Sequence, residues 1–195
     1  MAEVRERSRR RDRWVSWIVI GVFVVAVGLG WVVKLGAEGR SVPFAADGVR
    51  ASYPAGWVRK NVSPPFLLQV EDRGATSAAT TLTLQRRPSQ GSLGRMSQAL
   101  AVERGQSWGE CNAYRVLATE ESVSFYGHTG MHVAFAYVQV DPNPFMETTP
   151  VVMRGEDYLF PAGDQVYIVT IAAAEANLPR AQQDLHAFLA SLQVP

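Results

Sequence analysis

An uninterrupted apolar stretch near the N-terminus is the strongest pattern in the chain. Residues 14–33 carry no charged side chain, and twelve of these twenty residues are Val, Ile, Leu or Phe. A helix of this length extends about 30 Å, the thickness of a bilayer's hydrocarbon core. Its apolar side chains favour insertion by about 4 to 7 kcal/mol before the small and polar residues are counted. The pattern predicts one transmembrane helix over residues 14–35, with Trp14, Trp17 and Trp31 near its ends.

The charges on either side of this helix predict its orientation. Residues 1–13 hold six Arg against three acidic residues, whereas the next twenty residues after the stretch contain Lys34, Arg40 and Arg50. Positively charged flanks stay in the cytoplasm. We therefore expect a cytoplasmic tail at residues 1–13, in contact with anionic lipid, and an extracytoplasmic C-terminal domain, periplasmic or extracellular.

Two other readings of the apolar stretch remain open. A cleaved secretory signal has a shorter apolar core and a small-residue cleavage site, and the sequence Trp31-Val32-Val33-Lys34 is a poor cleavage context. The run Ser8-Arg9-Arg10-Arg11 resembles a twin-arginine signal, but arginine clusters flank many membrane anchors. An uncleaved signal anchor is the favoured interpretation.

Residues 36–43 form an expected linker, and residues 44–195 show the patterns of one α+β domain. Alternating or β-branched runs bounded by Gly and Pro predict strands. These runs are Val49–Tyr53, Phe66–Glu71, Ala79–Arg86, Tyr114–Ala118, Ser122–Tyr126, Met131–Val140, Val151–Arg154 and Gln165–Ala173. In Met131–Val140 both faces are largely apolar, which is typical of a strand covered on both sides.

Two helices interrupt the strand pattern. Ser92 is a suitable N-cap for a helix over Leu93–Arg104, whose Leu93, Met96 and Leu100 share one face. Asn177 is expected to cap a second helix that has Pro179 in its first turn. Its core-facing stripe consists of Ala181, Leu185, Phe188, Leu189 and Leu192. The expected fold is an antiparallel β-sheet flanked by helices, preceded by one transmembrane helix.

Charge and cysteine content narrow the functional classes. Residues 36–195 contain 12 basic and 15 acidic residues, so the domain lacks the basic face that nucleic-acid binding needs. Cys111 is the single cysteine of the chain, and no intrachain disulfide can form. A small apolar residue, an intermolecular disulfide and lipidation are the open roles for Cys111.

The domain resembles PsbP-like domains and the related mycobacterial LpqN-type lipoproteins. The segments that carry the resemblance are Val49-Arg50-Ala51-Ser52-Tyr53-Pro54-Ala55-Gly56-Trp57, the helix Leu93–Arg104, Tyr114-Arg115-Val116-Leu117, the stretch from Val123 to His128, the strand ending at Tyr137, Gly163-Asp164-Gln165-Val166-Tyr167-Ile168-Val169-Thr170, and the terminal helix with Phe188 and Ser191. The resemblance implies an α/β/α sandwich over about residues 44–195. It also implies an accessory or assembly role beside a membrane complex, and it carries over no catalytic residue.

Candidate catalytic and metal-binding residues are weak. His128 and His132 are four residues apart, about 13 Å along a strand, which is too far for a shared metal. The pairs Glu120-Glu121 and Glu156-Asp157 are read as solvated loop or strand ends, and neighbouring strand residues point to opposite faces. We therefore predict no enzymatic activity, no catalytic residue, no cofactor and no metal site.

Two features suggest interaction with other proteins. The proline-rich connection over residues 141–150 places Phe145 and Met146 near its tip. Such a loop either folds back onto its own sheet or, because it is pre-ordered, contacts a partner at low entropic cost. Gly21 and Gly28 share one face of the predicted transmembrane helix and allow close helix packing.

The sequence thus predicts a non-catalytic accessory subunit that contacts lipid and the other subunits of a membrane protein complex. By analogy, the complex would be a respiratory or photosynthetic electron-transfer complex. The alternative is a membrane-tethered domain that binds a small ligand or lipid.

Overall fold

The computed structural model describes Trp17 and residues 19–31, 40–74, 78–89, 91–107, 111–140 and 149–195. The chain divides between Arg40 and Ser41 into two units, each described here by itself.

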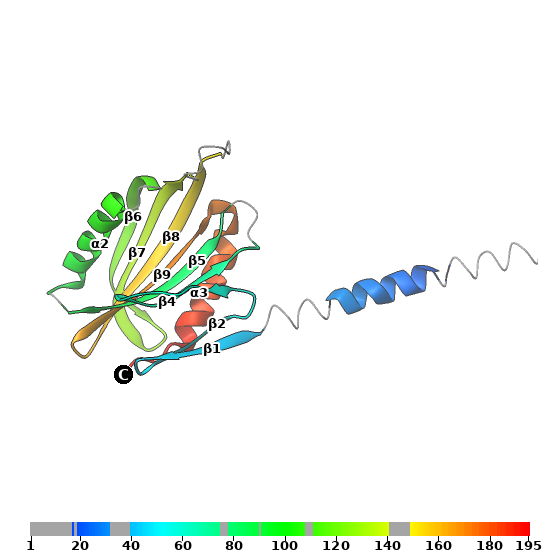
Figure 1. Ribbon diagram of the computed structural model, residues 1–195, viewed down its shortest axis with the longest axis horizontal. Coiled ribbons are helices and arrows are strands. Elements are labelled where there is room, and N and C mark those ends of the chain that lie inside the picture. Colours follow the sequence, from blue (N-terminus) through cyan, green and yellow to red (C-terminus); the bar gives the residue numbers. More distant parts are fainter. Residues whose placement is uncertain are drawn as a thin grey trace, which may run out of the picture. The chain divides into compact units, whose positions relative to one another are not determined.

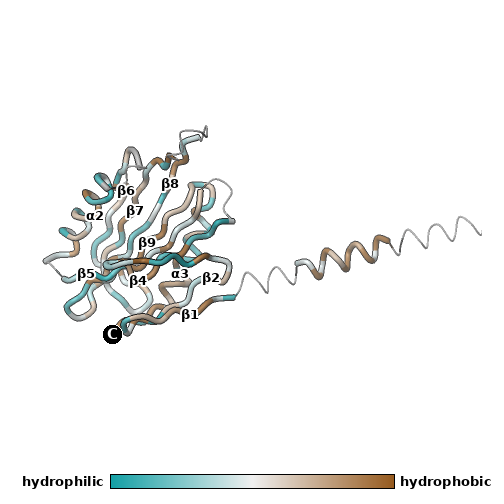
Figure 2. Tube along the Cα trace, in the orientation of Figure 1, coloured by the Kyte–Doolittle hydropathy of each residue, from teal (hydrophilic) through white to brown (hydrophobic). Residues whose placement is uncertain are grey.

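In the first unit, residues 19–31 are helical, and the helix is largely apolar (Figure 2). Within the part of the chain that the structure describes, no helix combines the length and the apolarity that crossing a bilayer requires. The predicted span over residues 14–33 extends beyond this helix at both ends, into positions outside the described residues.

The second unit is built on an antiparallel sheet that has seven strands within the described residues, in the order β3-β4-β5-β9-β8-β7-β6 (Figure 1). In chain order the strands are β3 (Val58–Arg59), β4 (Phe66–Asp72), β5 (Thr80–Pro88), β6 (Cys111–Phe125), β7 (His128–Gln139), β8 (Val151–Ala162) and β9 (Gln165–Ala174). The C-terminal strand β9 pairs with both β5 and β8, so it joins the two halves of the sheet.

The predicted strands are present, the short strand β3 was not predicted, and there are three larger differences. β8 continues to Ala162 instead of ending at Arg154, and the two predicted strands between Tyr114 and Tyr126 form the single strand β6. A further strand, β1 (Ser41–Ala46), begins inside the predicted linker and pairs with β2 (Val49–Pro54).

The strand β7 is fully buried on only one of its two faces. Met131, Val133, Phe135 and Tyr137 are buried, as the alternation predicts. The other face, from His132 to Val138, is half-buried, so the expectation of full cover on both sides is wrong for this face.

Two helices cover opposite faces of the sheet. Helix α2 (Leu93–Ser107) places Leu100 in a cluster with residues of β7, β8 and β9, and Leu93 and Met96 pack against it. Ser92 caps this helix as predicted, because its hydroxyl accepts a hydrogen bond from the Arg95 amide at 3.4 Å.

Helix α3 (Leu178–Ser191) lies on the other face, after the short 3₁₀ helix η1 (Glu175–Asn177). The predicted stripe is buried: Ala181, Leu185, Phe188, Leu189 and Leu192. Asn177 occupies the N-cap position, but its side chain makes no capping hydrogen bond, contrary to the prediction.

The β1–β2 hairpin packs against α3 and extends the same core. Phe44, Val49 and Tyr53 of the hairpin are buried in one cluster with the α3 stripe. Arg50 exchanges backbone hydrogen bonds with Gln193 at 2.9 and 2.7 Å. The turn after β2 is closed by the Trp57 amide, which donates to the Pro54 carbonyl, and Trp57 is buried, as the sequence predicts.

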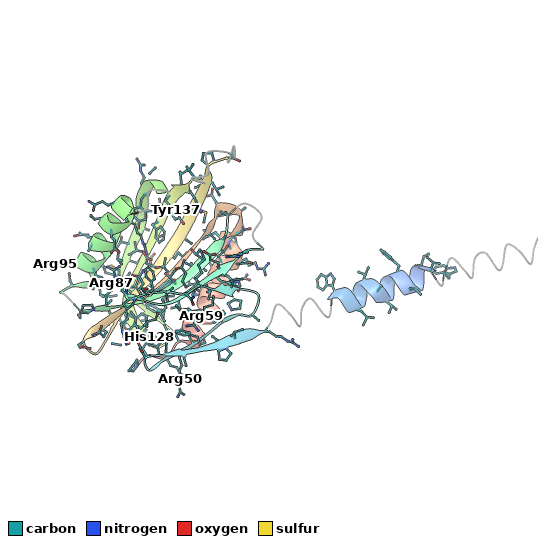
Figure 3. The ribbon with its side chains drawn as sticks, viewed as in Figure 1. Arg50, Arg59, Arg87, Arg95, His128 and Tyr137 are labelled. Carbon is teal, nitrogen blue, oxygen red and sulfur yellow. The ribbon has the colours of Figure 1, made fainter. Side chains whose placement is uncertain are left out.

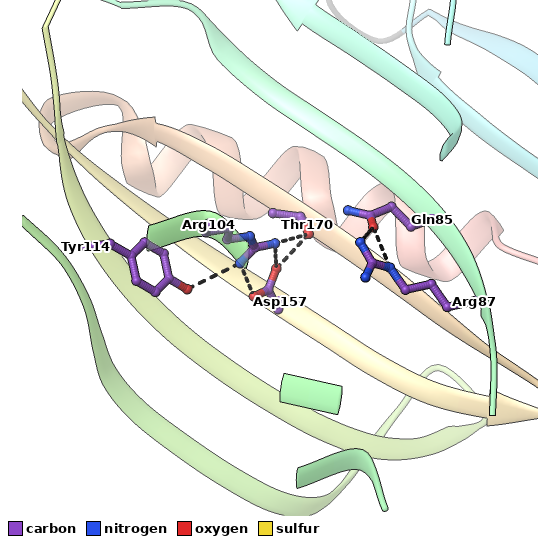
Figure 4. A network of polar contacts seen from close by, with 6 residues as sticks. All are labelled: Gln85, Arg87, Arg104, Tyr114, Asp157 and Thr170. Carbon is purple, nitrogen blue, oxygen red and sulfur yellow. Dashed lines mark hydrogen bonds and ion pairs between the residues drawn. The ribbon is translucent and has the colours of Figure 1, made fainter. Parts of the chain in front are cut away.

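A buried ion pair fastens α2 to the middle of the sheet (Figure 4). Arg104 Nη1 and Nη2 donate to Asp157 Oδ2 and Oδ1 of β8 at 2.5 and 2.8 Å, and Nη2 also donates to Thr170 Oγ1 of β9 at 3.1 Å. The Thr170 hydroxyl in turn donates to Asp157 Oδ1 at 2.6 Å. The side chains of Arg104 and Asp157 are 6% and 4% exposed, so water screens this bidentate pair very little.

The surroundings of Arg104 favour its charge. Burial opposes the charged form, but the Asp157 carboxylate raises the pKa of Arg104 above its ordinary value. The guanidinium also lies 4.6 Å from the centre of the Phe135 ring, and the Tyr114 hydroxyl is 3.4 Å from Nη1. Burial raises the pKa of Tyr114, which keeps this hydroxyl neutral beside the pair.

A second ion pair links α2 to β5 nearer the surface. Arg87 makes two hydrogen bonds to Glu103, at 2.8 and 3.0 Å, and two more to Gln85 Oε1. The bonds from Arg87 lower the pKa of Glu103. Because the Glu103 side chain is 50% exposed, this pair contributes much less than the buried one.

We predict that Arg104→Met destabilises the protein by about 3 to 5 kcal/mol, because it leaves the Asp157 carboxylate buried without its partner. The triple variant R104M/D157V/T170V removes the ion pair together with the threonine hydroxyl and should recover most of that loss. Urea denaturation of the full chain in detergent micelles, followed by near-UV circular dichroism, measures both effects. Arg87→Met is the matched control and should cost about 1 kcal/mol or less; equal losses for R87M and R104M would contradict the assignment.

Candidate functional site

The helix of the first unit carries one of the predicted contact surfaces. Gly21 lines an open groove with Val22, Val25, Ala26 and Leu29, whereas Gly28 is not part of its lining. Apart from the nearby backbone of the helix itself, a Cβ atom added at Gly21 or at Gly28 would meet no atom of the described residues within 4 Å. Both positions can therefore accept a close neighbour without rearrangement of the helix itself.

The second predicted surface falls outside the described residues, because these exclude Phe145 and Met146. The strands before and after this connection, β7 and β8, are neighbours in the sheet. Gln139 at the end of β7 pairs with Val151 at the start of β8. Val152 beside them is 48% exposed, so apolar surface reaches this end of the sheet.

The edge strand β6 is a surface that the sequence did not single out. Among the described strands it pairs with β7 alone, and its Val116 and Leu117 side chains are 45% and 49% exposed. The pairing register shifts three times along β6, including a shift between Glu120 and Val123. Such bulges and the charged residues along the strand protect an edge from indiscriminate pairing, so β6 is an edge suited to selective contacts.

A titratable cluster joins β6, β7, β8 and α3 on the face that α3 covers. His132 Nε2 lies 3.4 Å from Glu156 Oε2, and His132 Nδ1 lies 3.8 Å from Glu120 Oε2. Gln182 Nε2 of α3 donates to Glu156 Oε1 at 2.5 Å, and the rings of His132 and Tyr158 are 4.7 Å apart. Residues of three sheet strands therefore meet at the His132 imidazole, and helix α3 joins the cluster through Glu156.

The neighbours within this cluster shift the pKa values of His132, Glu156 and Tyr158. The Glu156 carboxylate raises the pKa of His132, burial opposes this, and Glu120 adds to the rise. Reciprocally, His132 lowers the pKa of Glu156 against the effect of burial, and Gln182 assists. Burial, with the two glutamates, raises the pKa of Tyr158 to about 12, so its hydroxyl stays neutral.

Sequence reasoning missed this cluster because it took Glu156-Asp157 for a solvated strand end. The two residues do point to opposite faces, as predicted, but both lie inside β8: Asp157 binds Arg104 of α2 and Glu156 binds Gln182 of α3. His128 lies at the start of β7, where its ring stacks on Phe160 at 4.3 Å (Figure 3). Among the described residues, no group of three or more His, Cys, Asp or Glu is placed to hold a metal ion.

A small cavity lies at the start of α3. It measures about 100 Å³ and is lined by Trp57, Asp72, Gly74, Thr80, Asn177, Arg180, Ala181 and Asp184. Burial raises the pKa of Asp184, and Asp72 adds to this while Arg180 opposes it. Sites for small molecules usually occupy about 300 to 1,000 Å³, so this cavity has room for a few water molecules.

Comparison with known proteins relates the chain to a fold. A scan of protein-family models found no match to the sequence, and a search of curated proteins found no significant match. Among solved structures, cyanobacterial PsbP from Synechocystis sp. PCC 6803 is similar with a TM-score of 0.55 at 14% identity, over 82% of this chain and 94% of that one.

Two further solved structures match less well. LpqN of Mycobacterium tuberculosis, described as involved in cell envelope biogenesis, has a TM-score of 0.48 at 8% identity, over 80% of this chain and 91% of its own. The Ran-binding protein Mog1p of Saccharomyces cerevisiae has a TM-score of 0.47 at 8% identity, over 80% and 95% of the two chains. The similarity to cyanobacterial PsbP carries the conclusion, and the domain of this chain has the PsbP-like fold.

Proposed function

We propose that this protein is a non-catalytic accessory subunit of a larger membrane protein complex. One N-terminal helix anchors it, and its PsbP-like domain docks on the extracytoplasmic face of that complex. The specific complex would be one of respiratory or photosynthetic electron transfer, by analogy with the fold.

The observation that carries the proposal is the apolar helix of the first unit. Its side chains project from the helix on all sides, and those of Val22, Phe23 and Val24 are 62–68% exposed (Figure 3). In water such a surface would be unfavourable over the whole helix, whereas lipid or a partner helix would cover it. The absence of charge over residues 14–33 and the arginines before them agree with this environment.

Features of the domain support a docking role. The edge strand β6 exposes Val116 and Leu117, and the cavity at Trp57 is smaller than sites for small molecules usually are. Exposed apolar side chains on a protected sheet edge suit a protein partner, because they add contact area without opening the edge to self-association.

We predict that replacing both Val24 and Val25 with Arg releases the protein from the membrane. Each Arg at the centre of a span opposes insertion by about 2.5 to 3.5 kcal/mol, so two offset the apolar contribution of the segment. The measurement is the fraction that stays in the membrane after alkaline carbonate extraction, with Val24→Leu and Val25→Leu as the conservative control. Release of the unchanged protein by carbonate would refute the anchor.

For the helix contact, we predict that Gly21→Ile with Gly28→Ile lowers the amount of assembled complex in native gels by at least about tenfold, because the added side chains separate the helices. Gly30→Ile is the control, since nine residues at 3.6 per turn place Gly30 on the face opposite Gly21. Among the described residues, all three glycines have open space around the Cβ position, so the three changes are matched in their surroundings. Migration of the wild type as a free monomer after mild detergent extraction would count against the contact.

For the loop, we predict that Phe145→Ser with Met146→Ser weakens partner binding by about 10- to 30-fold and leaves the melting temperature unchanged, because these side chains serve the contact and not the core. Quantitative crosslinking in native membranes followed by mass spectrometry gives the readout. Val102→Ser is the comparison variant, since Val102 is 57% exposed on α2 and away from the loop in sequence. If both variants crosslink to the partner equally well, Phe145 and Met146 are not part of the docking surface.

A further inference from the structure

The cluster around His132 holds together elements that the backbone joins weakly. The edge strand β6 pairs with β7, and the register of that pairing breaks between Glu120 and Val123. Ser122 within this break has φ of 60°, a left-handed conformation that serine rarely adopts. Side-chain contacts at Glu120 therefore matter more to the position of this part of β6 than they would in a regular ladder.

The imidazole of His132 lies between two carboxylates from different strands. Glu156 on β8 is on one side, with a 12% exposed side chain, and Glu120 on β6 is on the other, with a 63% exposed side chain. His132 itself is 17% exposed, and its Nε2 atom is buried and makes no hydrogen bond to any of the described residues, although Glu156 Oε2 is 3.4 Å away. A proton on this nitrogen would convert it from an unsatisfied buried atom into a charged donor beside a carboxylate.

We propose that His132 is a pH-sensitive clasp: when protonated, it ties the edge strand β6 through Glu120 to Glu156 on β8, and through Gln182 to helix α3. When the ring is neutral, it has one N–H and can donate to only one of the two carboxylates, so the link between them is broken and β6 around Glu120 is held mainly by its interrupted backbone pairing with β7. This inference is independent of the proposed docking function, because it concerns contacts within the domain.

The charged groups that face His132 all favour its protonated form. On β8 the charged and titratable groups are Glu156, Tyr158 and, behind the sheet, Asp157; on β6 the group is Glu120. Asp157 is already paired with Arg104, and Tyr158 is neutral. From α3, Gln182 is neutral, and His186 acts on Glu156 in the same sense as His132.

The pH window follows from the signs of the two shifts. Because the pKa of His132 is raised in the fold, its stabilising contribution is complete below the ordinary value of 6.5 and is lost as the pH rises through the folded value. Because the pKa of Glu156 is lowered, its contribution is present above 4.5 and is lost as the pH falls through the folded value. The clasp is therefore strongest between about pH 4.5 and 6.5 and opens at higher pH.

Hydrogen exchange of the full chain in detergent micelles tests the clasp. The measured quantity is the protection factor of the amides from Thr119 to Ser124 at pH 5.5 and pH 8, which corrects for faster intrinsic exchange at high pH. We expect protection in the wild type to fall by about threefold to tenfold between the two conditions, since one unit of pKa change corresponds to a tenfold change in an equilibrium. His132→Gln should show low, pH-independent protection there, while protection in β9 stays unchanged.

Glu121→Gln is the matched control, since it removes the neighbouring carboxylate of β6, which is not among the groups that raise the pKa of His132, and it should keep the pH dependence of the wild type. Glu156→Gln provides a second test if H132Q does not fold, because it should lower the pKa of His132 measured by NMR and reduce the pH effect on β6. Equal protection of the wild type at both pH values, unchanged pH dependence in H132Q, or an unchanged pKa of His132 in E156Q would each overturn the proposal.

Discussion

The position of helix α2 depends on one buried charge pair. Leu100 is the fully buried apolar anchor of α2, with Leu93 and Met96 partly buried beside it, which is a modest apolar contact for a helix of 15 residues. Arg104 adds a bidentate bond to Asp157 at the centre of the sheet, where both side chains are almost fully buried. Because an unpaired charge at such a place is strongly unfavourable, the two residues stabilise the correct docking of α2 and disfavour any shifted one.

The residues packed around Arg104 and Asp157 leave space for their ion pair. The Arg104 guanidinium lies over the Phe135 ring, and a Cβ atom at Gly155 would stand 2.3 Å from that ring. A side chain at Gly155 would displace the ring that covers Arg104. The ion pair, the aromatic ring and the glycine are thus one packing unit, drawn from α2, β7 and β8.

Features that repeat locally along the chain could be predicted from the sequence. Contacts between residues far apart in the chain could not. The stripe of α3 and the buried face of β7 were predicted correctly because apolar periodicity encodes them. β8 was cut short at Arg154 because Glu156 and Asp157 look like a solvated end, and their partners on α3 and α2 are far away in the chain. β6 was divided because its bulge at Ser122 interrupts the alternation, which a single chain cannot distinguish from a turn.

The two faces of the sheet hold charge in different ways. Beneath α2 the cation is an arginine, which keeps its proton at every pH a cell meets, so the Arg104–Asp157 pair is permanent. On the α3 face the cation is a histidine, whose charge changes near neutral pH. The permanent pair lies at the centre of the sheet and the titratable cluster lies toward its β6 edge, so a change in pH acts on the edge and leaves the core intact. For a domain exported as proposed, the pH outside the cell is the one that His132 would meet, and the edge strand that it holds is also the strand that exposes Val116 and Leu117 to a partner.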